Sequence, residues 1–220
     1  MKLGVLFSGG KDSTYAAWLA EKEGHELECL ITLFSENTES FMFHTPAIEL
    51  TKKQAKLMQI PILTRETKGE KEKELKDLKR AIEKAKIKYN IQGIVTGALA
   101  SNYQAERIQK ICDELELKCL NPLWGKNQTE YLGELIRNKF EIIITAVAAY
   151  PLNEKWIGRK IDEKFIVETK RLSEKFGINP AGEGGEFESL VLNCPLFQSK
   201  LNIKLMDIRG EGNSFRGFFE

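Results

Sequence analysis

The chain has 220 residues, enough for one large domain or two small ones with a buried core. Its 33 Lys and Arg residues almost balance its 32 Asp and Glu residues, whereas a general nucleic-acid-binding protein carries a strong basic excess. We see no signal peptide and no apolar run long enough to span a bilayer, so we expect a cytoplasmic protein with no membrane partner.

The four cysteines do not form a metal-binding pattern. None belongs to a C-x-x-C pair; His25 stands four residues before Cys29 with no second cysteine nearby, and His44 lies far from every cysteine in the sequence. A structural zinc site or an iron–sulfur cluster is therefore not expected. Cys112 falls on the apolar side of a predicted helix, where we expect it to act as a small buried hydrophobic residue.

The first predicted strand leads into a glycine turn. The apolar run Leu3–Phe7 predicts the strand, and helical spacing begins at Ser13 and continues to Glu23. Between them, Ser8–Ser13 reads Ser-Gly-Gly-Lys-Asp-Ser. Two glycines let backbone N–H groups approach an anion, Ser13 can cap the helix, and Lys11 adds a positive charge. This order predicts a nucleotide phosphate site.

Two common phosphate-binding motifs do not fit this turn. Gly4 and Gly9 have the Walker separation, but Gly10 stands where that motif needs its Lys, and Asp12 follows Lys11 where Ser or Thr is required. No Gly-x-Gly-x-x-Gly fingerprint of a dinucleotide site is present. An ordinary glycine-rich strand-to-helix turn is the alternative interpretation.

The rest of the first half continues to alternate strands and helices. Strands are expected at Glu26–Leu33, from Ile60 to Leu63 and at Ile91–Thr96, and helices at Pro46–Met58, Leu75–Tyr89 and Tyr103–Leu117. We expect a polar and aromatic loop over Phe34–His44, and we interpret the charge run Gly69–Lys79 as the solvated face of a helix. Apolar strands alternating with helices predict an α/β fold with a parallel sheet covered on both faces.

A second turn of small residues follows the strand that ends at Thr96. Ligands of such sheets bind outside the carboxyl ends of the strands, so Gly97–Ser101 and Ser8–Ser13 should form one crevice. We expect the nucleotide to contact Gly97, Ala98 and Ser101. Tyr103, Gln104 and Arg107 begin the next helix, where Arg107 either reaches a phosphate or carboxylate or is simply solvated.

The sequence changes character after residue 120, which predicts a nucleotide-binding domain over 1–120 and a smaller α/β domain over 121–220. In the second part we expect helices at Thr129–Lys139 and Asp162–Phe176, and strands at Ile142–Ala149, Ser189–Asn193, Leu201–Arg209 and Ser214–Phe219. One side of the later helix should carry Phe165, Ile166, Thr169, Leu172 and Phe176.

An acidic, glycine-rich stretch precedes the strand at Ser189. It places Glu183, Glu186 and Glu188 around Phe187, and no Lys or Arg lies between Phe176 and Leu196. Such a group of carboxylates suits binding a cation, ligating magnesium or taking a proton from an amine. An exposed acidic turn is the alternative.

Three further residues are weaker candidates. Trp124 and Trp156 are expected to fill a core or a domain interface more readily than to stack on a ligand. Arg159 is a candidate to reach the crevice.

Taken together, these residues resemble the diphthine–ammonia ligase family, a branch of the ATP pyrophosphatases. The nucleotide domain of this PP-loop superfamily is of the HUP type, a Rossmann-like parallel sheet. The resemblance runs nearly end to end and rests on Ser8–Ser13, on Gly97 to Arg107, on Leu123-Trp124, on Ile157 to Asp162 and on Glu183 to Ser189. Position 189 is Ser where many relatives would carry Thr.

The resemblance implies an adenylating reaction. The carboxylate of diphthine, a modified histidine on translation elongation factor 2, would be adenylated by ATP with release of pyrophosphate. Ammonia would then form diphthamide with release of AMP. It implies ATP and Mg²⁺ as cofactors, the elongation factor and ammonia or ammonium as partners, and it is compatible with a homodimer.

The same resemblance implies roles for the candidate residues. Residues Ser8 to Ser13 would hold the leaving pyrophosphate, with catalytic roles for Lys11 and Asp12 and with Asp12 serving the magnesium ion. The acceptor would be bound by Tyr103, Gln104, Arg107, Trp124, Arg159 and Glu186. We hypothesise that Glu183, Glu186 and Glu188, with Tyr103 or Trp124, surround the trimethylammonium group of diphthine or take a proton from ammonium.

Two other functions share parts of this pattern. A tRNA-modifying ligase of the PP-loop superfamily would carry the same loop, but we find neither an RNA-binding extension nor a catalytic cysteine arrangement. A nucleotide-sensing HUP module would bind ATP without turnover, and Lys11 to Ser13 together with the distant glutamates argue against it.

Overall fold

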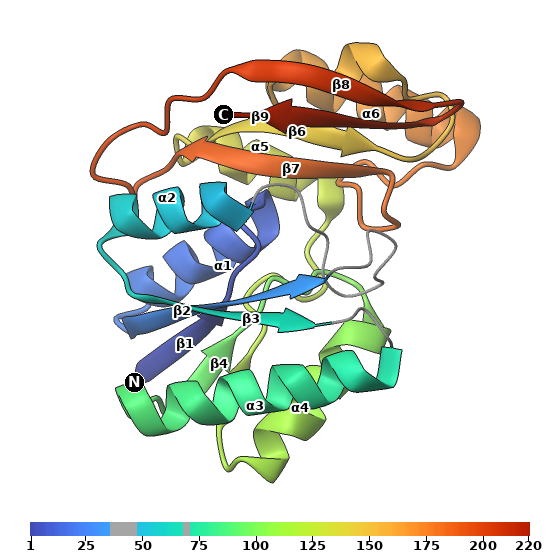
Figure 1. Ribbon diagram of the computed structural model, residues 1–220. Helices are drawn as coiled ribbons and strands as arrows, with labels where there is room; N and C mark the ends of the chain where they lie inside the picture. Colours follow the sequence, from blue (N-terminus) through green and yellow to red (C-terminus); the bar gives the residue numbers. More distant parts are fainter. Residues whose placement is uncertain (36–47, 68–70) are drawn as a thin grey trace. The chain divides into compact units, whose positions relative to one another are not determined.

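The computed structural model describes residues 1–35, 48–67 and 71–220. By their packing these residues divide into two units, which Figure 1 shows coloured along the chain. The first unit is Met1–Ser8 with Asp12–Trp124, and the second is Gly9–Lys11 with Gly125–Glu220. Phe34 and Ser35, the first two residues of the predicted loop at Phe34–His44, are the last residues of strand β2 (Glu26–Ser35), and the rest of that loop, including His44, lies outside the described residues.

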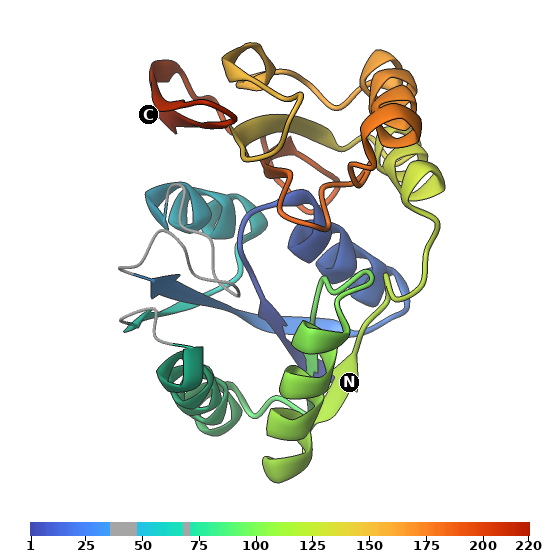
Figure 2. The same cartoon turned by 90° about the vertical axis from the view of Figure 1, so that its right-hand side faces the viewer.

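The first unit contains a five-stranded parallel sheet in the order β3-β2-β1-β4-β5. The strands are β1 (Lys2–Leu6), β2 (Glu26–Ser35), β3 (Ile62–Thr67), β4 (Gly93–Val95) and β5 (Lys118–Leu120). The helices are α1 (Lys11–Lys22), α2 (Ile48–Met58), α3 (Lys71–Tyr89) and α4 (Asn102–Glu114). Figure 2 shows α3 and α4 on one face of this sheet and α1 on the other. The predicted α/β sheet with helices on both faces is confirmed.

Apolar side chains fill the space between this sheet and the helices α3 and α4. Strands β2 and β4 contribute Ile31 and Ile94, α3 contributes Ile82, and α4 contributes Ile108 and Cys112, all 6 % exposed or less. Burying a side chain of this size stabilises a fold by about 1.5–3 kcal/mol. The prediction that Cys112 is a buried apolar residue is confirmed.

The thiol of Cys112 lies close to a second cysteine. A hydrogen bond with Cys119 and burial raise the pKa of Cys112, and the same hydrogen bond lowers the pKa of Cys119. Burial raises the pKa of Cys29 to about 12. Among the described residues all four cysteines are free thiols.

Three local predictions in this unit need correction. Strand β5 was not predicted, because its three residues directly follow a helix and are too few to show a strand pattern in the sequence. Helix α1 begins at Lys11, so Ser13 lies inside its first turn and does not cap it. Glu74, inside the charge run interpreted as solvated, is only 1 % exposed.

The strand order places β1 beside β4 at the centre of the sheet, although the chain passes through β2 and β3 between them. The connections that follow β1 and β4 therefore leave toward different sides of the sheet from neighbouring carboxyl ends. Such a switch point is where open α/β sheets bind ligands. It is formed here by the turns after Phe7 and after Val95.

The second unit contains a four-stranded antiparallel sheet in the order β7-β6-β9-β8. Its elements are α5 (Gln128–Arg137), β6 (Glu141–Val147), the short 3-10 helix η1 (Glu154–Trp156), α6 (Glu163–Phe176), β7 (Phe187–Asn193), β8 (Leu205–Glu211) and β9 (Ser214–Phe219). The helices α5 and α6 pack against each other and cover one face of the sheet (Figure 1).

Local sequence signals explain where α6 begins and ends. The Asp162 side chain accepts the Phe165 N–H at 2.8 Å, and Gly177 takes the left-handed conformation that ends many helices. Phe165 is fully buried as predicted, but Phe176 in the last turn is 37 % exposed, against the prediction. Trp156 is buried with its ring 5.5 Å from that of Phe165, as expected for a core residue.

Strand β8 is one of the two outer strands of the second sheet and is exposed along its whole length. Asp207 binds to its own strand: one carboxylate oxygen accepts the Ile208 N–H at 2.9 Å and the other accepts the Arg209 Nε–H at 2.7 Å. The hydrogen bond to Arg209 lowers the pKa of Asp207. Across the described part of the chain, no helix combines the length and apolarity needed to cross a membrane.

Candidate active site

The end of β1 is fixed by hydrogen bonds to the neighbouring strand. The Phe7 N–H donates to the Ile31 carbonyl at 2.9 Å, and the Thr32 hydroxyl donates back to the Phe7 carbonyl at 2.7 Å. One residue later the chain turns: the Ser8 N–H donates to Ser13 Oγ at 3.2 Å, and the two hydroxyls lie 3.1 Å apart. The loop thus closes onto the first turn of α1.

The turn after β4 lies directly against this first turn. A Cβ atom placed on Gly97 would come within 2.7 Å of both the Asp12 carbonyl carbon and the Ser13 nitrogen. Only glycine permits that approach, because both neighbours are backbone atoms. Gly97 thus lies against Asp12 and Ser13, whereas the crevice expected between the two segments stays a prediction.

The turn itself is ordered by short-range hydrogen bonds. The Ala98 N–H donates to Thr96 Oγ1 at 3.0 Å, and Ser101 caps α4 by accepting the Gln104 N–H at 3.4 Å. Ala98 is 5 % exposed. Helix α4 therefore begins at the carboxyl end of β4. Its amino end, which carries a partial positive charge, lies on the same side of the sheet as the loop that follows β1.

Arg107 lies on top of Tyr103 in the first turns of α4. Its guanidinium carbon is 3.4 Å from the centre of the Tyr103 ring, and Nη1 donates to the Tyr103 carbonyl at 3.2 Å. A stacked guanidinium already covers one face of the ring, so that face of Tyr103 is not available to a trimethylammonium group. The Nε atom of Arg107 is buried and has no hydrogen-bond partner among the described residues.

The middle of the loop belongs to the second unit. The Gly9 carbonyl accepts the Val191 N–H at 3.1 Å, and the Lys11 N–H donates to Ser189 Oγ at 3.2 Å. Gly9 has a φ of 79°, which glycine adopts without strain. Gly9–Lys11 therefore lies along β7.

The Lys11 side chain is buried against aromatic rings. Only 3 % of the residue is exposed, and Nζ lies 5.6 Å from the Phe187 ring and 6.0 Å from the Tyr131 ring. The sequence predicted a charge directed at phosphate; the structure places this ammonium group over two ring faces. Tyr131, on α5, is a contact that sequence reasoning missed, since nothing marks it beyond its place on an apolar helix face.

The carboxylate of Glu186 is bound by its own loop. One oxygen accepts the Asn179 N–H at 2.7 Å and the other accepts the Gly184 N–H at 2.8 Å. The Glu186 carbonyl also accepts the Ala148 N–H at 2.9 Å. Both carboxylate oxygens thus hold backbone groups, which suits a residue that shapes the loop.

Glu188 points to a different place. In β7 it lies opposite Ala146 of β6, which in turn lies opposite Arg216 of β9. Across the small Ala146, Arg216 approaches the Glu188 carboxylate at 3.5 Å, and both side chains are mostly buried. Because side chains alternate along a strand, Glu188 lies on the other face from Phe187 and Ser189.

The three glutamates therefore do not converge as the sequence suggested. Glu186 and Glu188 are engaged separately, and Glu183 is half-buried in the loop. Within the described residues, no three His, Cys, Asp or Glu side chains gather into a possible metal site.

The remaining candidates are placed as follows. Arg159 pairs with Glu168 at 2.7 Å, and its guanidinium carbon is 4.3 Å from the Trp156 ring centre. Trp124 is 45 % exposed, so it is not a core residue. Asp12 is half-buried at the start of α1.

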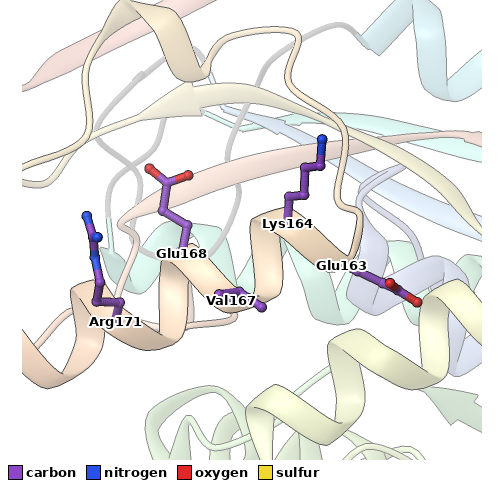
Figure 3. A pocket seen from close by; sticks show the side chains of 5 residues that line it. All are labelled: Glu163, Lys164, Val167, Glu168 and Arg171. Atoms are coloured by element: carbon purple, nitrogen blue, oxygen red, sulfur yellow. The ribbon is translucent and has the colours of Figure 1, made fainter.

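An open hollow of about 620 Å³ runs along α6 (Figure 3). Its lining consists of Glu163, Lys164, Val167, Glu168 and Arg171. None of the predicted site residues lines it, and its walls are side chains of one helix. We therefore do not assign it to the site.

Comparison with known proteins agrees with the motifs. Residues 1–119 match the family model of the diphthamide synthase N-terminal domain, and residues 127–220 match that of the C-terminal domain. The chain is 32 % identical to the diphthine–ammonia ligase of Bos taurus over 94 % of this chain and 85 % of the relative. The chain belongs to the diphthine–ammonia ligase family.

Other members are equally similar. The Rattus norvegicus diphthine–ammonia ligase is 33 % identical over 91 % of this chain and 82 % of its own length. Among solved structures, the predicted subunit of tRNA methyltransferase from Methanocaldococcus jannaschii matches at 17 % identity and a TM-score of 0.45, covering 89 % of this chain and 98 % of that one. Family membership rests on the sequence relatives, and the resemblance inferred from the motifs is confirmed.

Proposed function

We propose that this protein uses ATP and ammonia to convert diphthine to diphthamide. The observation that carries the proposal is the match of both halves to diphthamide synthase domains, with a glycine loop and the Gly97 turn in backbone contact at the switch point of the parallel sheet. This arrangement suits a nucleotide whose phosphates lie at the start of α1.

The reaction proceeds in two steps. An oxygen of the diphthine carboxylate attacks the α-phosphorus of ATP, and the bond to the β-phosphate oxygen breaks to release pyrophosphate. Ammonia then attacks the acyl carbon of the adenylate; AMP leaves and the nitrogen loses a proton. Charge builds on the pyrophosphate oxygens in the first step, so backbone N–H groups aimed at them lower the barrier, each contact by about 3 kcal/mol.

The first 120 residues form the ATP-binding part in this proposal. Residues Ser8 to Ser13 receive the phosphates, and Gly97, Ala98 and Ser101 border the nucleotide. Magnesium in such sites is held mainly by phosphate oxygens and water with one or two carboxylates. Asp12 is the carboxylate of the loop and would help to hold such an ion, which would supply positive charge beside the leaving pyrophosphate.

Residues 121–220 provide the acceptor-binding part. Of the three glutamates in the acidic stretch, we propose Glu183 as the one that contacts the trimethylammonium group or takes a proton from ammonium. In this part Trp124, which has an exposed ring, and Arg159 are proposed acceptor contacts. Gln104, in the first 120 residues, is a further proposed contact. We assign Glu186 to the shape of the loop that carries Glu183, because both of its oxygens accept backbone N–H groups.

The protein partner in this proposal is translation elongation factor 2 that bears diphthine, and the reaction takes place in the cytoplasm with free ammonia or ammonium. A homodimer is compatible with the reaction but is not required by it. No general nucleic-acid binding is part of the proposal, since the net charge is only +1.

The decisive experiment supplies the protein with ATP, magnesium, ammonium and elongation factor that bears diphthine. Mass spectrometry of the factor should show conversion of the acid to the amide, with pyrophosphate and AMP formed in equal amounts. Pyrophosphate formation that is independent of the factor, or binding of ATP without any turnover, would contradict the proposal.

A further inference from the structure

The segment Gly9–Lys11 lies along an outer edge of the antiparallel sheet in the second unit. Strand β7 is an outer strand, with β6 as its one neighbour within that sheet. On its open side the Val191 N–H donates to the Gly9 carbonyl, and Ser189 Oγ accepts the Lys11 N–H. Positions 189 and 191 are two residues apart, so their backbones face the same edge. The edge of β7 thus holds the loop at two points.

These two points lie on either side of the conformationally free part of the loop. Gly9 and Gly10 have no Cβ, and without external contacts they would populate many backbone conformations. Fixing the Gly9 carbonyl and the Lys11 N–H holds the two peptide groups on either side of the Gly10 Cα atom. A loop held in this way is already ordered before a phosphate arrives, which reduces the entropy lost on binding.

The Lys11 side chain adds a third contact to the same strand. Phe187 lies two residues before Ser189 and so on the same face of β7, and its ring is 5.6 Å from Lys11 Nζ. The ring is held in turn by an edge-to-face contact with Phe165 at 5.5 Å. Backbone and side chain of Lys11 are therefore both bound to the strand that follows the acidic stretch.

From this geometry we propose that Ser189 is a positioning residue for the pyrophosphate-binding loop. Its hydroxyl accepts one of the N–H groups that open α1 and so sets the direction of the remaining ones toward phosphate. The last residue of the Glu183–Ser189 motif thus acts on ATP and not on the acceptor. This inference rests on the proposed function only in naming ATP as the ligand.

The test compares three variants. Ser189→Ala removes the hydroxyl that accepts the Lys11 N–H; Ser189→Thr keeps a hydroxyl; Ser214→Ala is a control at an exposed serine in β9 of the same sheet. We expect the dissociation constant for a non-hydrolysable ATP analogue to rise about fivefold in Ser189→Ala, the effect of losing one hydrogen bond. Ser189→Thr and Ser214→Ala should stay within twofold of the parent.

Steady-state kinetics separate positioning from a general loss of structure. In Ser189→Ala the KM for ATP should rise while the KM for ammonium and the melting temperature change little. An unchanged affinity for the analogue in Ser189→Ala, or an equal loss in Ser189→Thr, would overturn the inference. Failure of the proposed function would give a different result, because the parent protein would then form no amide. The affinities of the variants for the ATP analogue would still test the role of Ser189.

Discussion

The turn at Gly97 and the acidic stretch at Glu183–Ser189 were both predicted to belong to the site, and the structure shows a different kind of contact in each. At Gly97 the contact is backbone on backbone, with no room for a methyl group beside Asp12 and Ser13. In the acidic stretch the side chains that look catalytic are used to hold backbone and a neighbouring arginine. A glycine in such a turn can therefore indicate a close approach between two backbone segments. The sequence does not show whether a carboxylate is available to a ligand or is already bound by other groups of the protein.

The strongest test of this contrast is Gly97→Ala. A Cβ at 2.7 Å from two backbone atoms forces the turn and α1 apart, a strain of about 1–3 kcal/mol or more. We expect affinity for an ATP analogue, measured by calorimetry, to fall at least tenfold. Gly133→Ala on α5 is the control, because its Cβ would meet only the flexible end of Arg137. Equal affinities in the two variants would show that the close approach is not needed.

On the acidic side, Glu186→Gln should weaken the loop without touching nucleotide binding. An amide has one acceptor oxygen, so only one of the two N–H groups, of Asn179 and Gly184, keeps a good partner. We expect a loss of about 1–2 kcal/mol in stability and a several-fold fall in amide formation, with ATP affinity unchanged. Unchanged amide formation would rule out any part for Glu186 in acceptor binding.

A smaller effect is expected for the pair across Ala146. Glu188→Gln removes the charge that Arg216 faces at 3.5 Å and should cost about 1 kcal/mol of stability. A double-mutant cycle with Arg216→Gln, followed by chemical denaturation, measures the coupling. A coupling near zero would mean that the two side chains are held in place by packing alone.

The smallest effect belongs to the surface of the first unit. The pKa of Glu114 is lowered by its hydrogen bond to Lys79, which joins α4 to α3. A carboxyl group whose pKa is lowered by folding stabilises the folded state at pH values above its ordinary pKa. This contribution disappears as the pH falls through the pKa of the group in the folded state. Glu114→Gln should leave the melting temperature at pH 7 almost unchanged, and a marked drop would contradict this interpretation.

The sequence allowed most of the first unit to be predicted. Hydrophobic periodicity identified four of its five strands, and Gly97 was recognised together with its partner loop. What could not be predicted depends on contacts distant in the chain. The Lys11 ammonium over Phe187 and the Glu188–Arg216 pair depend on which residues the fold brings together. Phe176 failed for a local reason, since the last turn of a helix often extends beyond its core.

The exposed strand β8 has a consequence for the solubility of the protein. An outer strand with free backbone groups is a template for adding strands from other copies, the first step toward aggregates. Asp207 counters this by taking up the Ile208 N–H and by placing a charged pair on the rim. Asp207→Ala is thus expected to make a concentrated solution aggregate sooner on warming, as measured by turbidity. The rate of amide formation should not change, since Asp207 is not one of the proposed site residues.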